Sequence, residues 1–148
     1  MSPSGTIYEP LQHTFSSPPF GRAEVADAMR LGVVSCPAAT PLREAARIMA
    51  TNRIHCVVVF DVAGEQPVRV VSDLDLTAAA GEDLDKRTVG EVARAEPLKI
   101  GSGEPLARAA QLMVEHETPH LLVVQPESGH PVGVLSTLDL AGVLAWGN

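Results

Sequence analysis

The sequence has 148 residues, of which 45% are apolar and 20% charged, and it carries a net charge of -7. A chain of this length and composition can fold as a globular protein without disulfides or a metal. The negative charge argues against nucleic acid as a partner, because proteins neutralise phosphates with Lys and Arg. No apolar run is long enough to span a membrane and no secretory signal pattern is present, so we expect a cytoplasmic protein without a membrane partner.

Residues 1–24 are rich in Pro, Ser and Gly and show no hydrophobic period, which predicts an N-terminal arm. The arm packs on the body of the protein or on a second chain, or else it is a mobile tail. The apolar residues through which it would pack are Ile7, Tyr8, Leu11, Phe15 and Phe20.

Helix and strand patterns begin after this arm. A short helical turn at 25–29 and a strand at 33–36 precede a longer helix. Thr40 can cap this helix, and Pro41 lies in its first turn, where no backbone N–H is needed. The apolar face has the spacing of a core-facing helix and consists of Leu42, Ala45, Ala46 and Met49.

Two more strands and a helix complete the first set of elements. The β-branched run 56–60 predicts a strand buried on both faces, and a strand at 67–71 leads into a helix that ends near Ala80. After a polar connector the same order recurs, with a turn at 89–92, a strand at 98–100, a helix at 105–116, strands at 120–124 and 131–135, and a helix ending near Trp146.

The two sets are copies of one repeat. Residues 25–80 align with 89–144 at an offset of 64 without a gap, and 15 of the 56 aligned positions are identical. Each repeat has the order β-α-β-β-α. A helix joins the first two strands, so they should run parallel, and the last two should form an antiparallel hairpin. We therefore divide the chain into an arm (1–24), repeat 1 (25–80), a connector (81–88) and repeat 2 (89–146).

Each repeat ends its last strand with a Ser, followed three residues later by an Asp, where a helix begins. The pairs are Ser72 with Asp75 and Ser136 with Asp139. A carboxylate there can accept two hydrogen bonds from a vicinal diol, and a helix N-terminus offers N–H groups to a phosphate. The same spacing is that of a capping box, in which both residues only stabilise the helix start. The two roles are compatible.

The duplicated pattern, closing each time on this motif, resembles the CBS domain pair, also called the Bateman module. The resemblance covers residues 25–146. It implies an α/β (α+β) fold in which two tandem β-α-β-β-α repeats pack sheet to sheet with pseudo-twofold symmetry. It also implies clefts between the repeats that bind an adenosine-containing ligand such as AMP, ADP, ATP, S-adenosylmethionine or NAD, with no cofactor required.

By this resemblance the motif Asp residues would hold ribose hydroxyls, the motif Ser residues would hold phosphate, and nearby strand ends would border the base. Site 1 would comprise Ser35, Cys36, Cys56, Arg69, Val70, Ser72, Asp73 and Asp75. Site 2 would comprise Lys99, Ile100, His120, Gly133, Val134, Ser136, Thr137 and Asp139.

Two features depart from the family pattern. Gly is frequent where repeat 1 has Arg69, whereas repeat 2 has Gly133. A long side chain there would fill the cleft or reach for a phosphate. Pro is frequent in the second strand, where this chain has Val58 and Leu122. We therefore expect site 2 to be the better nucleotide site.

Histidines and cysteines suggest a third interpretation, a metal or redox sensor. His116 and His120 are four residues apart, but Pro119 breaks the helix between them, so we expect no metal site. Cys36 ends one strand and Cys56 begins the neighbouring parallel strand, which could bring them close. We interpret them as buried apolar residues rather than a redox pair. No nucleophile–base–acid set is recognisable, so we expect no enzyme.

The sequence therefore predicts a stand-alone regulatory module that binds an adenosine-containing ligand and signals to an unknown effector protein by conformational change, as a homodimer. Scarce lysine and the negative charge favour AMP or an adenosyl group over ATP. The alternative is a structural or dimerisation module with vestigial nucleotide sites, in which Asp75 and Asp139 only cap helices.

Overall fold

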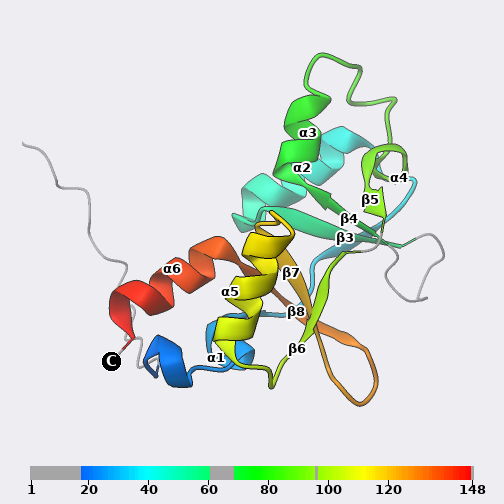
Figure 1. Cartoon of the computed structure of the whole chain (residues 1–148). Helices are drawn as coiled ribbons and strands as arrows, with labels where there is room; N and C mark the ends of the chain where they lie inside the picture. Colours follow the sequence, from blue (N-terminus) through cyan, green and yellow to red (C-terminus); the bar gives the residue numbers. More distant parts are fainter. Residues whose placement is uncertain (1–17, 61–68, 96, 148) are drawn as a thin grey trace, which may run out of the picture.

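The computed structural model describes residues 18–60, 69–95 and 97–147, and in this part of the chain the strands form two four-stranded sheets (Figure 1). The first sheet has the order β2-β3-β4-β5, with β2 at Ser35–Pro37, β3 at Cys56–Phe60, β4 at Arg69–Ser72 and β5 at Arg94–Ala95. The second has the order β1-β8-β7-β6, with β1 at Arg30–Leu31, β8 at Pro131–Ser136, β7 at His120–Val124 and β6 at Lys99–Gly101.

Helices cover the outer side of each sheet (Figure 1). Those of the first sheet are α2 (Leu42–Asn52) and α3 (Asp73–Ala78), with the short α4 (Val89–Val92). Those of the second are α5 (Leu106–Glu115) and α6 (Thr137–Trp146), with η2 (Phe20–Arg22) and α1 (Val25–Ala28).

Strand pairing confirms the predicted order in both repeats. β2 runs parallel to β3 and β6 parallel to β7, while β3–β4 and β7–β8 are antiparallel. The bounds of β3 and β7 agree with the sequence prediction, whereas β2 begins later than expected, at Ser35. Val33 and Val34 do not belong to the strand because they lie in the connection between the two sheets and line a cavity there.

The two repeats are interlocked through their first segments. β1, at the start of repeat 1, pairs with β8 of repeat 2, and β5, at the start of repeat 2, pairs with β4 of repeat 1. The same exchange occurs in the cores. Val25 is fully buried in the core of repeat 2, and Val89 is fully buried in the core of repeat 1. The core of each repeat therefore includes a residue from the first segment of the other repeat.

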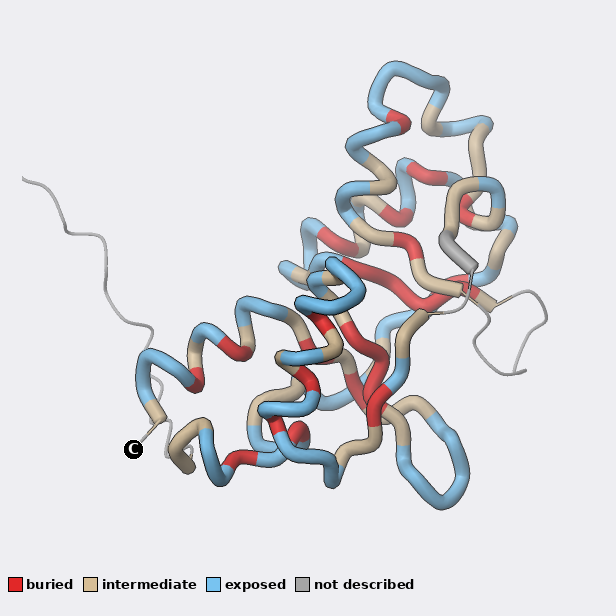
Figure 2. The backbone as a smooth tube through the Cα atoms, viewed as in Figure 1, coloured by how far each residue is buried: buried red, intermediate tan, exposed pale blue. Residues whose placement is uncertain are grey.

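One face of β3 packs against the helices of its own repeat, and the other face points at repeat 2. Val57 and Val59 belong to the core under α2, while Cys56 and Val58 are also buried but lie outside that core. Alternate residues of a strand face opposite sides, so Cys56 and Val58 point at repeat 2. Figure 2 shows the buried residues following these central strands, and the predicted burial of this strand on both faces is confirmed.

The predicted helix cap at Thr40 is wrong. α2 begins at Leu42 with Pro41 at its N-cap position, and it has no side-chain cap. The Thr40 hydroxyl instead hydrogen-bonds with the Cys36 thiol, and its carbonyl accepts the Val89 N–H at 2.8 Å. Thr40 therefore connects α4 to the core of repeat 1. The contact arises from a segment nearly fifty residues away, which no local pattern reveals.

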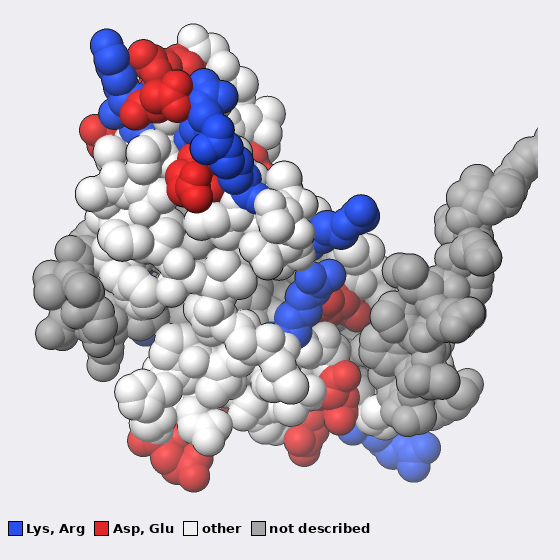
Figure 3. All heavy atoms as spheres, turned by 180° about the vertical axis from the view of Figure 1, so that it is seen from behind, with Lys and Arg blue, Asp and Glu red and all other residues white. Residues whose placement is uncertain are grey.

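The first core is flanked by a charged surface at the far end of repeat 1, where side chains of both signs gather (Figure 3). Arg43 pairs with Asp85 at 2.6 Å, and Arg87 pairs with Glu82 and Glu91. These pairs are exposed, so each adds little to stability. Of the apolar arm residues, Phe20 packs against the second core, and Ile7, Tyr8, Leu11 and Phe15 lie outside the described residues.

Candidate functional site

Two cavities lie between the repeats, and each draws residues from both. Their volumes are about 320 Å³ and 380 Å³, at the lower end of the range for ligand pockets, roughly 300–1,000 Å³. Cavity A is lined by residues 30–34, 52, 54–56, 120, 134, 136, 138 and 139. Cavity B is lined by residues 56, 70, 72–75, 97, 98, 116–122 and 134.

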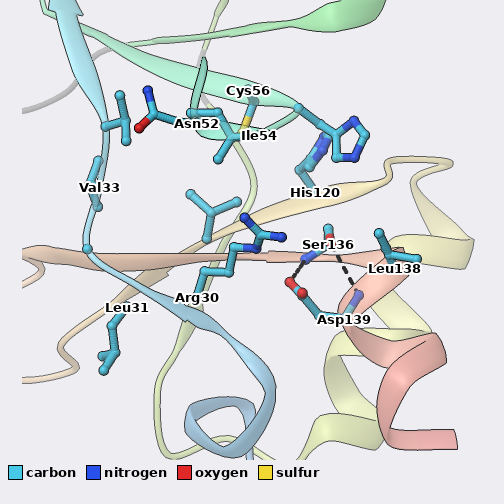
Figure 4. Close-up of a pocket in the computed structure, with 14 residues that line it drawn as sticks. Arg30, Leu31, Val33, Asn52, Ile54, Cys56, His120, Ser136, Leu138 and Asp139 are labelled. Carbon is cyan, nitrogen blue, oxygen red and sulfur yellow. Dashed lines mark hydrogen bonds between the residues drawn. The ribbon is translucent and has the colours of Figure 1, made fainter. Parts of the chain in front are cut away.

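Cavity A contains the motif of repeat 2 at the start of α6 (Figure 4). The Ser136 backbone N–H donates to Asp139 Oδ2 at 2.8 Å, and the Asp139 N–H donates to Ser136 Oγ at 3.2 Å. These two bonds form the capping box that the spacing predicts. Asp139 Oδ1 has no protein partner among the described residues. The carboxylate thus caps the helix with one oxygen and keeps the other available.

Repeat 1 supplies the opposite side of cavity A. Val33 and Val34 come from the connection before β2, Ile54 comes from the connection between α2 and β3, and Cys56 begins β3. These side chains are apolar, as is Leu138 beside the motif. Figure 4 shows Val33, Ile54 and Leu138 around the same space as the motif of repeat 2. The cavity therefore combines aliphatic walls with a carboxylate and a hydroxyl.

The structure places the residues expected in site 2 in different parts of the fold. Val134, Ser136, Asp139 and His120 do line cavity A, but Gly133, Thr137, Lys99 and Ile100 line neither cavity. Ile100 is buried in the second core, and Lys99 and Thr137 are exposed elsewhere. We expected Lys99 and Ile100, which belong to the same repeat as the motif, to lie beside Asp139. Residues 30–34 and 54–56 of repeat 1 line the cavity with Asp139 instead.

Gly133 has a packing role instead. A Cβ at this position would lie 2.3 Å from the carbonyl oxygen of Arg30. Only a glycine lets β1 approach β8 this closely. Gly133 therefore shapes cavity A indirectly, because β1 carries Arg30 and Leu31 to the cavity wall.

Cavity B repeats this arrangement around the motif of repeat 1. The Ser72 N–H donates to Asp75 Oδ2 at 2.8 Å and the Asp75 N–H to Ser72 Oγ at 3.2 Å, again a capping box. Cys56, Val70, Ser72, Asp73 and Asp75 line this cavity, together with residues 97–98 and 116–122 of repeat 2.

Three residues expected in site 1 lie elsewhere. Arg69 donates through Nη1 to the Gly90 carbonyl at 2.6 Å, so its side chain lies along α4 rather than in the cleft. Cys36 is buried beneath α2, where burial raises the pKa of its thiol. Ser35 is exposed on β2. Neither of the roles proposed for Arg69, filling the cleft or reaching for a phosphate, fits this placement.

Cys56 and His120 line both cavities and occupy equivalent positions in the two repeats. Beside them, His55 Nδ1 lies 2.8 Å from Asp73 Oδ2, and the His55 and His120 rings are 5.9 Å apart. Burial raises the pKa of Cys56 to about 11. Burial, then the charge of His55, lowers the pKa of His120, against smaller opposite effects of Asp73 and Asp139. At neutral pH this shared wall presents an uncharged thiol and an uncharged His120 ring.

The positions of the histidines, carboxylates and cysteines bear on the metal and redox alternatives. No cluster of three metal-ligating side chains occurs among residues 18–60, 69–95 and 97–147. Cys36 is paired with Val59 in the sheet, three residues along β3 from Cys56. An odd offset places the two thiols on opposite faces of the sheet, roughly 10 Å apart along the strand. The expectation that they could be close is wrong.

The fold and its cavities define a module of two interlocked repeats with a potential ligand site on each side of a common wall. The chain belongs to the CBS domain family, whose model matches residues 25–82 and 89–145. The resemblance inferred from the sequence, and the fold it implied, are thereby confirmed. None of the helices in the described part of the chain is long and apolar enough to cross a membrane.

Solved structures agree with this assignment. The CBS domain pair of protein MJ0100, in complex with 5′-methylthioadenosine and S-adenosyl-L-methionine, has a TM-score of 0.74 at 20% identity, covering 83% of this chain and 96% of that chain. The CBS domain protein PAE2072 from Pyrobaculum aerophilum, complexed with AMP, has a TM-score of 0.71 at 31% identity, covering 82% and 95%. CBSX2 in complex with AMP has a TM-score of 0.66 at 26% identity, covering 82% and 96%. The comparison with curated proteins finds no match.

Proposed function

We propose that this chain is a regulatory, non-catalytic module that binds an adenosine-containing ligand in cavity A and signals to a partner protein. The observation that supports the proposal most directly is the hydrogen bonding of the Asp139 carboxylate. Its Oδ2 accepts the Ser136 N–H, while Oδ1 has no protein partner among the described residues. A ribose diol can donate to that oxygen without breaking the helix cap. The aliphatic walls suit the two faces of a purine, and they are formed by Val33, Val34, Ile54, Val134 and Leu138.

The complexes of related proteins support an adenosine ligand. PAE2072, at 31% identity over most of this chain, was solved with AMP. CBSX2, at 26% identity, was also solved with AMP. A purine nucleoside is thus the ligand class that we assign to cavity A.

Signalling would follow from the fact that both repeats line the cavity. Its walls come from both repeats, so a bound ligand favours the relative placement of the repeats that closes the cavity around it. We propose a homodimer as the signalling unit, in the cytoplasm. Exposed apolar side chains on α3 and α6 support a dimer surface, among them Leu74, Leu138 and Leu144, each more than 60% exposed.

A second candidate function is a dimerisation module with vestigial sites. The completed capping boxes of Ser72–Asp75 and Ser136–Asp139 favour it, because they account for both motifs without any ligand.

A thermal-shift panel distinguishes the two functions. The ligands are AMP, ADP, ATP, S-adenosylmethionine and NAD, and the proteins are wild type, Asp139→Ala and Asp27→Ala. Asp27 is the matched control, since it caps α1 through the Glu24 N–H at 2.8 Å but lines neither cavity. A ligand that binds only the folded state adds about 2.7 kcal/mol at 100 times its dissociation constant.

The proposed function predicts a shift with at least one adenosine compound that Asp139→Ala removes and Asp27→Ala retains. Both variants should lose about 1 kcal/mol of stability in the absence of ligand, because each loses a cap. No shift with any of these compounds, in a protein that forms a dimer, would reject ligand binding and favour the dimerisation module.

A further inference from the structure

His120 is a titratable side chain in the wall that the two cavities share. It begins β7, where it pairs with Ser136 of β8, and it lines both cavity A and cavity B. Figure 4 shows its side chain between Cys56 and the motif of repeat 2. The residue is half-buried, so part of its surface is open to solvent. A ligand that fills either cavity would remove that solvent from the ring.

The other histidines of the cavities belong to one cavity each. His55 lines cavity A and His116 lines cavity B. The repeat counterpart of His120 is Cys56, which also lines both cavities. Burial raises the pKa of the Cys56 thiol to about 11, so this group stays uncharged in mildly acidic and neutral solution. Among the described residues, His120 is therefore the histidine whose protonation changes the charge of both cavities.

The groups that face His120 act on its charge in opposite directions. Burial is the largest effect, and together with the charge of His55, whose ring is 5.9 Å away, it lowers the pKa of His120. The carboxylates of Asp73 and Asp139 act the other way, and Asp73 Oδ2 also lies 2.8 Å from His55 Nδ1. Loss of solvent around the ring, or of either carboxylate's charge, would make protonation still less favourable.

Further charged side chains line the cavities. Arg30 lines cavity A, and Asp75 and Glu117 line cavity B. Arg94, the counterpart of Arg30, has a side chain outside the described residues. Carboxylates and guanidinium groups ordinarily titrate outside the range between mildly acidic and neutral pH. A change in charge that is common to both cavities over this range is therefore assigned to His120.

An uncharged ligand opposes the protonated ring in two ways. It replaces solvent around the imidazolium, and desolvation disfavours the charged form of a histidine. In cavity A the ribose would also donate to Asp139, one of the two carboxylates that favour the imidazolium. Ligand binding then lowers the proton affinity of His120. By thermodynamic linkage, protonation lowers the ligand affinity by the same factor.

Resting on the proposed function, we propose that His120 is a proton switch common to both cavities: its protonation weakens the binding of an uncharged adenosine compound in either cavity, and binding in one cavity expels the proton to solvent and favours binding in the other. The coupling belongs to mildly acidic solution, where the ring is protonated before the first ligand binds. At neutral pH the ring is already uncharged, and the two cavities bind independently.

Isothermal titration with adenosine and with 5′-methylthioadenosine, from neutral to mildly acidic pH, tests this coupling. Neither compound ionises in that range, so any change in affinity belongs to the protein. The wild-type affinity should fall by at most about tenfold per pH unit below the pKa of His120, because a single proton is displaced. The isotherm should be cooperative in this range and non-cooperative at neutral pH. Titration in buffers of different ionisation enthalpy should show proton release on binding.

Variants of the histidines identify the group that titrates. In His120→Gln the affinity should not change with pH and the isotherm should be non-cooperative throughout, whatever its affinity at neutral pH. The matched controls are His116→Gln, from cavity B alone, and His130→Gln, which lines neither cavity; both should behave like wild type. His55→Gln should move the pH dependence to higher pH, because it removes a charge that opposes protonation of His120.

Asp139→Ala separates the cavities. It should leave binding in cavity B pH-dependent but without cooperativity, because ligand binding in cavity A is lost. Melting of each protein without ligand, at each pH, verifies that the fold is intact.

Several outcomes would overturn the inference while leaving the proposed function in place. These are a wild-type affinity that does not change with pH, a pH dependence that persists in His120→Gln, or one nucleoside bound per chain at every pH. Binding of AMP without binding of either nucleoside would also overturn it, because the switch concerns uncharged ligands. Absence of binding of adenosine, 5′-methylthioadenosine and AMP at every pH would reject the proposed function itself.

Discussion

Replacing Gly133 with alanine tests how closely β1 must approach β8. The added Cβ would lie 2.3 Å from the Arg30 carbonyl oxygen and 3.2 Å from the Met29 sulfur. The shortest ordinary carbon–oxygen contacts are about 3.3 Å, so β1 must move by roughly 1 Å. The Met29 side chain can rearrange, but the Arg30 oxygen belongs to the backbone of a strand that is paired with β8.

We expect Gly133→Ala to lower the free energy of unfolding by about 1–3 kcal/mol, the usual effect of overpacking at a buried position. Urea unfolding followed by circular dichroism measures this as a lower midpoint at an unchanged slope. AMP binding should weaken as well, because the displaced strand carries Arg30 out of register with cavity A.

Gly142→Ala is the matched control. Gly142 lies within α6, and a Cβ there would meet nothing within 4 Å. Alanine in a helix is more stable than glycine by about 0.5–1 kcal/mol, so this variant should be more stable than wild type. Equal stability of Gly133→Ala and wild type would refute the close approach of the strands, whatever Gly142→Ala does.

Two further predictions concern the wall shared by the cavities. Burial lowers the pKa of His120 below its ordinary value of 6.5, so the unfolded chain binds the proton more tightly and the free energy of unfolding should fall as the pH drops below 6.5. Urea unfolding at neutral and mildly acidic pH should show a smaller fall for His120→Gln than for wild type or for His130→Gln, an exposed control; equal falls in all three would contradict the burial argument. The Cys56 thiol, with a pKa of about 11, should resist iodoacetamide at neutral pH until the chain unfolds. Rapid labelling of folded Cys36→Ser protein, detected by mass spectrometry, would contradict its burial.

Local structure was predictable because its causes are local. The helix over Leu42–Asn52 follows from apolar residues at helical spacing, and the strand over Cys56–Phe60 follows from a β-branched run. The capping boxes at Ser136 and Ser72 follow from the Ser-x-x-Asp spacing alone. The duplication made these patterns reliable, since each one occurs twice.

The partners of each motif were not predictable in this way. We expected Lys99 and Ile100 beside Asp139, whereas residues 30–34 and 54–56 face it. The two-residue strands β1 and β5, which set this exchange, are too short to show a hydrophobic period. The burial of Val25 and Val89 in opposite cores is likewise a property of the packed repeats. It is a long-range contact that leaves no trace in the neighbouring sequence.

The sequence by itself determined the repeat, the order of its elements, the strand pairing within each repeat and the position of Asp139 at a helix start. These depend on side-chain pattern over a few residues and on the connection between adjacent strands. Only the tertiary structure decided that the repeats exchange their leading segments, that Arg30 rather than Arg69 lines a cavity, and that Cys56 and His120 belong to both cavities. Those features arise where two sheets meet, and the free energy of that contact depends on residues far apart in the chain.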